Sequence, residues 1–212
     1  MTSTPASTPG KPRGPYARTA ERRRKIAQAV LDLVVEKGHA AVTTAEVAER
    51  SDTREATVMY HFPTKEHLLV AALRFADDES EAAAPADFDV EYLRRFVTTT
   101  PRRVALMRLY AAMAGSATTP DSPAHEFFTE HYATVVTWFA NLVRRQQEAG
   151  EAHPALDPVQ AARQFVGVWD GLQGQWLVTQ DFDLAEELVT AVRRLTGQGF
   201  MAAHRAMVER PY

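Results

Sequence analysis

The chain has 212 residues, of which 45% are hydrophobic and 24% are charged, a composition typical of globular proteins and not of disordered chains. It contains no cysteine, which excludes disulfides, cysteine nucleophiles and thiolate metal sites. No apolar run reaches the roughly 18 residues that a membrane helix needs, and residues 1–14 lack the apolar stretch of a signal peptide. We therefore expect a cytoplasmic protein that does not act at a membrane.

The net charge of −3 hides an uneven distribution along the chain. The first 30 residues carry seven basic side chains and one acidic one, whereas the chain from Leu68 onward carries 13 basic and 19 acidic ones. A basic head on an acidic body favours a polyanionic partner for the head, and a nucleic-acid backbone is the simplest such partner. A solvated basic tail would give the same charge pattern.

Apolar residues recur at helical spacing through most of the chain. Ile26, Ala29, Val30 and Leu33 form the first stripe, and Gly38 follows it as a helix stop. No convincing alternating strand pattern or hairpin turn is present, so the sequence predicts an all-α fold. Further helical blocks are expected at residues 92–99, 102–114, 124–149, 159–180 and 184–208. A loop or a frayed helix end is expected at residues 77–89, and a loop at residues 149–157.

Residues 42–65 carry the most informative local pattern. Thr43 and Glu46 have the spacing of a capping box, with Val42 and Val47 as a hydrophobic staple, so a short helix begins here and ends near Arg50. Turn residues at 51–52 lead into a second short helix at about residues 54–60, which a proline at 63 ends. Two short helices joined by a tight turn form a helix-turn-helix, whose second helix can lie in a DNA major groove.

The run from Thr57 to Leu69, TVMYHFPTKEHLL, resembles the end of the DNA-binding domain of tetracycline-repressor (TetR) family regulators. The upstream elements match in order: an amphipathic helix, Gly38, and the family's T-T-x-E-V-A pattern at residues 43–48. Further along, the segment DGLQGQWL at residues 170–177 is similar to one in the eighth helix of many members. The resemblance implies about nine helices in two domains: a three-helix DNA-binding domain and a helical ligand-binding and dimerisation domain.

On this basis we expect a disordered basic arm at residues 1–17, the helix-turn-helix domain at 18–64 and the ligand-binding and dimerisation domain at 65–212. Hydroxyl groups at a helix start bind phosphate, although Thr43 also serves as a simple cap. Arg54 and Glu55 open the second helix and suit guanine and cytosine edges, or form a solvated charge pair. The candidate DNA-binding residues are Thr43, Thr44, Arg54, Glu55, Thr57, Tyr60 and Lys65, with the last two expected to contact the DNA backbone.

The second domain is rich in aromatic side chains, most of which belong in a core. Trp169, Gln173 and Trp176 share one helix face, and an amide beside two indoles suits a small apolar or aromatic guest. For any one of these residues taken alone, a core or interface position is the commoner role. The candidate ligand-binding residues are Tyr110, Phe128, Trp169, Gln173 and Trp176.

Glycines inside a helix cost about 1 kcal/mol each relative to alanine, and close helix approach offsets this cost. The resemblance implies a dimer in which the eighth and ninth helices of two chains form a four-helix bundle. The expected interface residues are Gly167, Gly171, Gly174, Leu188, Val192 and Leu195.

Other classes of protein fit the sequence less well. His125-Glu126 and Glu130-His131 suggest a helical metalloenzyme, but neither order of the zinc-binding motif is completed. A DNA-binding architectural dimer without an effector would need fewer residues than this second domain has. We therefore expect a non-enzymatic, ligand-responsive homodimeric repressor that binds a palindromic duplex operator, uses no cofactor or metal, and is released from DNA by a small apolar or aromatic molecule.

Overall fold

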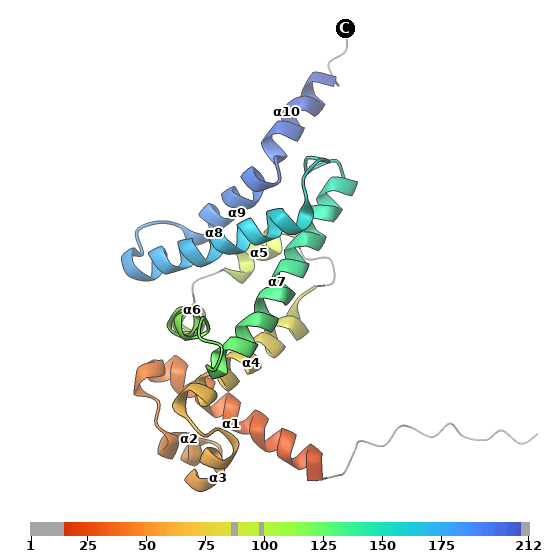
Figure 1. Ribbon diagram of the computed structural model, residues 1–212. Helices are drawn as coiled ribbons and strands as arrows, with labels where there is room; N and C mark the ends of the chain where they lie inside the picture. Colours follow the sequence, from red (N-terminus) through yellow and green to blue (C-terminus); the bar gives the residue numbers. More distant parts are fainter. Residues whose placement is uncertain (1–14, 86–88, 98–99, 209–212) are drawn as a thin grey trace, which may run out of the picture.

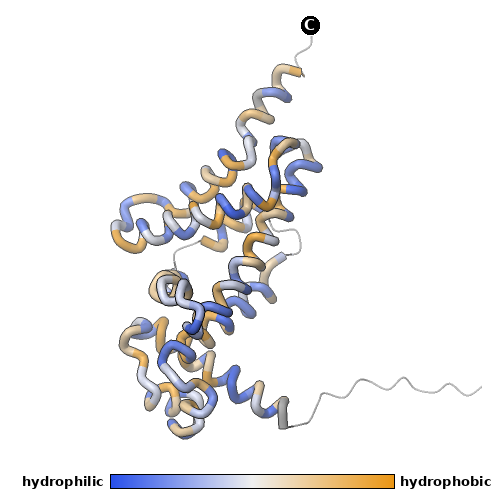
Figure 2. The backbone as a smooth tube through the Cα atoms, viewed as in Figure 1, coloured by the Kyte–Doolittle hydropathy of each residue, from blue (hydrophilic) through white to orange (hydrophobic). Residues whose placement is uncertain are grey.

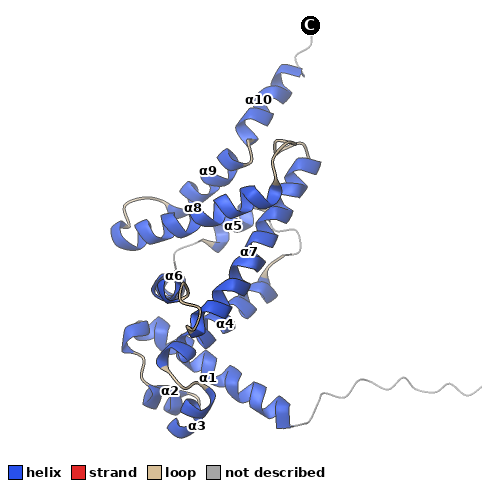
Figure 3. Ribbon diagram, in the orientation of Figure 1, coloured by secondary structure: helices blue, strands red, loops and turns tan. Residues whose placement is uncertain are grey.

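The computed structural model describes residues 15–85, 89–97 and 100–208, and every regular element in these ranges is helical (Figure 3). The all-α prediction is therefore confirmed. Besides a short 3₁₀ helix at His39–Ala41, the structure contains α1 (Pro15–Lys37), α2 (Thr44–Arg50), α3 (Glu55–His61), α4 (Lys65–Ala83), α5 (Val90–Phe96), α6 (Pro101–Ser116), α7 (Pro123–Glu148), α8 (Pro158–Thr179), α9 (Leu184–Leu195) and α10 (Gln198–Val208).

Helices α1–α3 form one end of the molecule, α8–α10 lie at the other, and α4 and α7 run between them (Figure 1). Hydrophobic and hydrophilic residues are interspersed along the helices, as amphipathic helices require (Figure 2). Accordingly, within the described ranges no helix combines the length and the apolar character needed to cross a bilayer.

The helix-turn-helix forms where its local chemistry predicts it. The Thr43 hydroxyl caps α2 by accepting from the Glu46 amide, and Val47 and Val58 are completely buried between the helices. Asp52 turns the chain with φ of 51°, the left-handed conformation expected in this corner, and Gly38 ends α1 with φ of 82°. Of the arm expected at residues 1–17, residues 1–14 lie outside the described residues. Residues 15–17 belong to α1, which begins at Pro15.

Helix α4 is longer than expected, because residues 77–83, predicted to be a loop or a frayed helix end, form regular helix. The run of acidic residues does not end the helix, since Asp77 is fixed by hydrogen bonds from α6 and α7. The helix ends only before Pro85, which favours the extended conformation found at Ala84. As a result α4 extends without interruption from the helix-turn-helix to the middle of the second domain.

The helices of the second domain begin at side-chain caps. Asp89, Thr100, Ser122, Asp157 and Asp183 each accept a backbone N–H of the helix that follows, and α6, α7 and α8 have proline in their first turn.

The last expected helix, residues 184–208, is divided in two in the structure. Gly197 has φ of 68°, outside the helical region, and separates α9 from α10. This glycine takes the position of a left-handed C-terminal stop, which the helical spacing alone did not reveal.

Candidate nucleic-acid interface and ligand cavity

The second helix of the helix-turn-helix, α3, carries large side chains that contact little of the protein itself. Tyr60 is 82% exposed and Met59 is 52% exposed, whereas Val58 between them and the core is buried. Arg54 is the N-cap residue of α3, is exposed, and makes no side-chain cap hydrogen bond. An arginine and a tyrosine thus extend from the same short helix into solvent.

The threonines at the start of α2 are partly engaged within the protein. Besides capping the helix, Thr43 donates its hydroxyl proton to the Glu46 carboxylate at 2.5 Å, and Lys37 forms an ion pair with the same carboxylate. These contacts lower the pKa of Glu46, with Lys37 as the largest cause. Thr44 donates to the Glu55 carboxylate, which links the start of α2 to the first turn of α3.

Lys65, expected at the DNA backbone, is exposed and donates from Nζ to the Ala40 carbonyl at 2.6 Å. An ammonium group has three donors, so this bond orients the group and leaves two protons free. A shallow depression also lies near the start of α3, between α1 and the turn that connects α2 to α3. It is lined by Arg22, Asp52, Thr53, Arg54 and Thr57.

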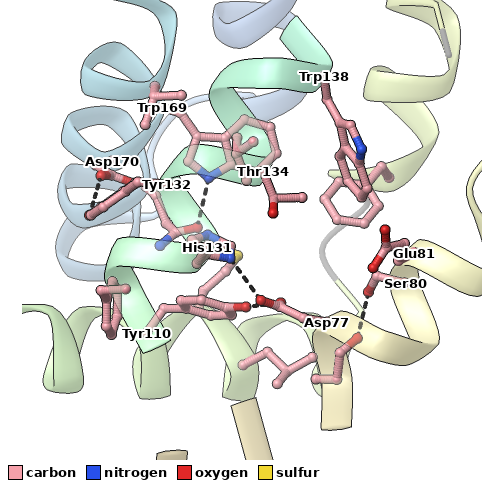
Figure 4. Close-up of a pocket in the computed structure, with 18 of the residues that line it drawn as sticks. Asp77, Ser80, Glu81, Tyr110, His131, Tyr132, Thr134, Trp138, Trp169 and Asp170 are labelled. Carbon is pink, nitrogen blue, oxygen red and sulfur yellow. Dashed lines mark hydrogen bonds and ion pairs between the residues drawn. The ribbon is translucent and has the colours of Figure 1, made fainter. Parts of the chain in front are cut away.

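A cavity of about 580 Å³ occupies the second domain (Figure 4). This volume falls within the range of about 300–1,000 Å³ typical of small-molecule sites. Helices α4, α5, α6, α7 and α8 all contribute lining side chains. The aromatic lining residues are Tyr92, Phe96, Tyr110, Phe127, Phe128, His131, Tyr132, Trp138, Phe139 and Trp169.

Asp77 fastens α4 to the cavity wall (Figure 4). One carboxylate oxygen accepts the Tyr110 hydroxyl proton from α6, and the other lies 2.7 Å from Nδ1 of His131 on α7. Burial, followed by the Asp77 charge and hydrogen bond, raises the pKa of Tyr110 well above its ordinary value. Tyr110 therefore stays protonated and acts as a permanent donor to α4.

A second hydrogen-bonded pair joins α7 to α8. The Tyr132 hydroxyl donates to the Asp170 carboxylate at 2.9 Å. Burial raises the pKa of Asp170, although the bond from Tyr132 acts in the opposite direction. On the same helix, the Trp169 indole donates to the side-chain oxygen of Gln173 at 3.2 Å.

Arg103 on α6 is a lining residue that the sequence did not single out. Its guanidinium carbon lies 3.9 Å from the centre of the Phe96 ring and 6.0 Å from that of Trp169. Burial lowers the pKa of Arg103, but a guanidinium remains charged at any physiological pH. Arg102 and Arg103 are adjacent in the first turn of α6, and nothing in the sequence shows which of the two faces the cavity.

Four of the five expected ligand-binding residues line the cavity: Tyr110, Phe128, Trp169 and Gln173. Trp176 does not, because its indole donates to the Phe182 carbonyl at 3.1 Å beside the loop that leads to α9. Seven residues along a helix return to the same face but advance by about 10 Å. The spacing therefore identified the correct face and placed Trp176 beyond the end of the cavity.

The expected interface residues divide into two groups. The glycines at 167, 171 and 174 have open space where a side chain would begin, with no atom within 4 Å. Leu188 and Val192 are instead buried in the core of the protomer with α5 and α8, at 0% and 3% exposure, and Leu195 packs against the same core. The apolar stripe of α9 forms one helix face as expected, and this face packs within the protomer. Its part in a dimer interface stays a prediction.

The histidines that suggested a metal site have other partners. His131 is bound to Asp77, and His125 contacts the Ala117 carbonyl at 2.9 Å. Across the described ranges, no three histidine, aspartate or glutamate side chains are grouped as metal ligands.

The fold and the two sites define a helical protein with a helix-turn-helix at one end and a second domain that contains a cavity large enough for a small molecule. The family model described as bacterial regulatory proteins of the tetR family matches residues 26–72, and the C-terminal model of BetI-type transcriptional repressors matches residues 90–198. The chain is 30% identical over 191 residues to the HTH-type transcriptional repressor KstR of Mycolicibacterium smegmatis, covering 84% of this chain and 88% of that protein. The protein belongs to the TetR family of bacterial transcriptional regulators.

Solved structures share this fold. A TetR-family regulator from Rhodococcus sp. is 23% identical and superposes with a TM-score of 0.64, covering 84% of this chain and 99% of that one. The multidrug binding protein EbrR, in complex with ethidium, is 28% identical with a TM-score of 0.61, covering 82% and 98% of the two chains.

Proposed function

We propose that this protein is a dimeric repressor that binds a palindromic operator and releases it when a small apolar or aromatic molecule occupies the cavity. In this proposal Arg54, Glu55 and Thr57 read base edges or phosphate in the major groove. Thr43, Thr44, Tyr60 and Lys65 contact the DNA backbone. The described residues at the start of α1 add positive charge beside them, since Arg22 borders the same depression as Arg54.

The observation that carries the proposal is the continuity of α4. Its first turn belongs to the helix-turn-helix, where Lys65 is bonded to Ala40, and its fourth turn belongs to the cavity, where Asp77 is bonded to Tyr110 and His131. A guest that displaces this part of α4 also moves the DNA-binding domain. An architectural DNA-binding protein would have no need of a cavity of this size.

Dimerisation completes the site, because one short recognition helix reads too few base pairs for specific binding. The glycine face of α8 supports the proposed interface, since it is open and would allow close approach of a second helix. Val178, near the end of the same helix, is 84% exposed. In the crystal complex of EbrR the family fold holds ethidium, an aromatic molecule, which agrees with the aromatic lining seen here.

The proposal is tested by gel retardation with the DNA upstream of the protein's own gene. We expect a single discrete complex on that DNA, stable against an excess of scrambled duplex, and a mass in sedimentation velocity of two chains per duplex site. Half-sites should be about one helical turn apart or somewhat more. Equal retardation of the upstream and scrambled duplexes, or specific binding by a monomer, would contradict the proposal.

A further inference from the structure

Several charged side chains around the cavity have partners among the described residues. Asp77 is bound by Tyr110 and His131, and Asp170 accepts from Tyr132. Arg74 forms ion pairs with Glu126 and Glu130 from α7. In contrast, no carboxylate or carbonyl of the described residues lies within ion-pairing or hydrogen-bonding distance of the Arg103 guanidinium.

The aromatic neighbours of Arg103 satisfy only part of what a guanidinium offers. A ring stacked at 3.9 Å covers the face of the group, and this contact is electrostatically favourable. The five N–H donors point outward in the plane of the guanidinium, where a stacked ring does not reach them. Arg103 borders the cavity, so these donors are available to a molecule inside it.

Arg103 is partly buried, and the charge of Asp77 favours its charged form only through space. A desolvated cation whose N–H donors have no acceptor is costly, and such groups are characteristic of sites where a ligand supplies the missing partner. A carboxylate is the group that a guanidinium binds best, because two parallel N–H···O bonds form at once. The lining also contains Asp78 and Glu81 on α4, both exposed. These two carboxylates disfavour a guest with several negative charges.

We propose that the cavity binds a molecule with an apolar or aromatic body and a single carboxylate, which forms a bidentate pair with Arg103. The body of the guest then lies along the aromatic side chains of α7, with Tyr132 and Trp138 on this wall (Figure 4). This inference rests on the proposed function, since it specifies the effector class of the same cavity.

The test compares probes that share a body and differ in charge: naphthylacetate, naphthylacetamide and naphthylmethyl-trimethylammonium, together with decanoate and decanamide. Binding is followed by intrinsic fluorescence, because Trp138 and Trp169 line the cavity. We expect each carboxylate to bind the full-length protein at least about tenfold more tightly than its amide. Arg103→Gln should remove this preference, so that the carboxylate and the amide of each pair bind within about twofold of one another.

Arg108→Gln is the matched control, since this arginine lies on the same helix, is exposed and does not line the cavity. It should bind all probes as the wild-type chain does. Tighter binding of the ammonium probe, equal affinity of acid and amide, a preference that persists in Arg103→Gln, or no binding of any probe would each overturn the inference.

Retardation of the operator on the same samples separates this inference from the proposed function. Binding of the carboxylate through Arg103 without release of DNA supports the inference and contradicts the repressor mechanism. Release of DNA that is equally effective with acids, amides and ammonium probes supports the mechanism and contradicts the inference.

Discussion

Replacing Arg103 with methionine should stabilise the ligand-free protein. Moving a guanidinium out of water costs several kcal/mol in protein interiors, and its contact with Phe96 returns about 2 kcal/mol at a desolvated site. Methionine keeps an apolar stem of similar length against the ring and removes the charge. Because Arg103 borders the cavity and keeps some contact with water, we expect a net gain of about 1–2 kcal/mol, or about 2–8 °C in Tm for a chain of this size.

The measurement is thermal and urea unfolding followed by circular dichroism, at one protomer concentration for all variants because a dimer's Tm depends on it. Arg108→Met is the control, since changes at exposed positions stay within about 0.5 kcal/mol. A fall in the midpoint of Arg103→Met, with Arg108→Met unchanged, would mean that Arg103 stabilises the fold. The argument for a charge held in reserve for a ligand would then be refuted.

Three further predictions concern other parts of the protein. In fluorescence anisotropy titrations, Arg54→Ala should weaken binding to a preferred operator by about 1–3 kcal/mol and leave binding to scrambled DNA unchanged. Lys65→Ala should weaken binding to both duplexes alike and lower the slope of affinity against salt concentration by about one. If both variants lose affinity uniformly on the two duplexes, Arg54 does not read bases. Gly171→Arg should increase the monomer fraction in sedimentation velocity with unchanged helix content, because open space surrounds this glycine in the protomer; an intact dimer would exclude the α8 interface. Burial raises the pKa of Asp170, so the free energy of unfolding of the wild-type chain falls as pH rises through the window above the ordinary carboxyl pKa. Asp170→Asn should therefore be more stable than the wild-type chain in urea unfolding at pH 7. The difference should shrink on acidification. Asparagine still accepts the Tyr132 hydroxyl proton, and a variant less stable at every pH would contradict this reasoning.

Local chemistry made the DNA-binding domain predictable. A cap such as Thr43, a left-handed corner such as Asp52 and a stop such as Gly38 each act within a few residues, so the sequence carries their signal directly. The spacing on α8 was informative in the same way, since Trp169 and Gln173 both line the cavity. Helix ends were harder to predict where tertiary contacts determine them. Asp77 is an example, because its hydrogen bonds to two helices distant in the sequence keep this part of α4 helical.

The cavity could be predicted only in part, because its wall comes from five helices whose relative positions the sequence does not encode locally. Residues on the face of Trp169 were found, but the end of the cavity before Trp176 was not. Leu188 shows why a dimer interface is equally hard to predict from sequence. An apolar stripe has the same periodicity whether it packs against its own protomer or against a second one, and here α5 already covers it.

Release of DNA requires more than tight binding of a guest. A ligand shifts the spacing of two recognition helices only by the difference between its affinities for the two arrangements. Arg103 on α6 and Asp77 on α4 both line the cavity, and Asp77 holds α4 through Tyr110, a residue of the same helix as Arg103. A guest anchored at Arg103 therefore acts on the helix that fixes α4, and an arrangement in which α6 moves toward the anion alters the bond to Asp77. A coupling of about 1–3 kcal/mol, typical for allosteric proteins, corresponds to roughly 5–150-fold weaker operator binding. The hydrogen bond between Tyr110 and Asp77 is a direct contact between α6 and α4 through which such a coupling can act.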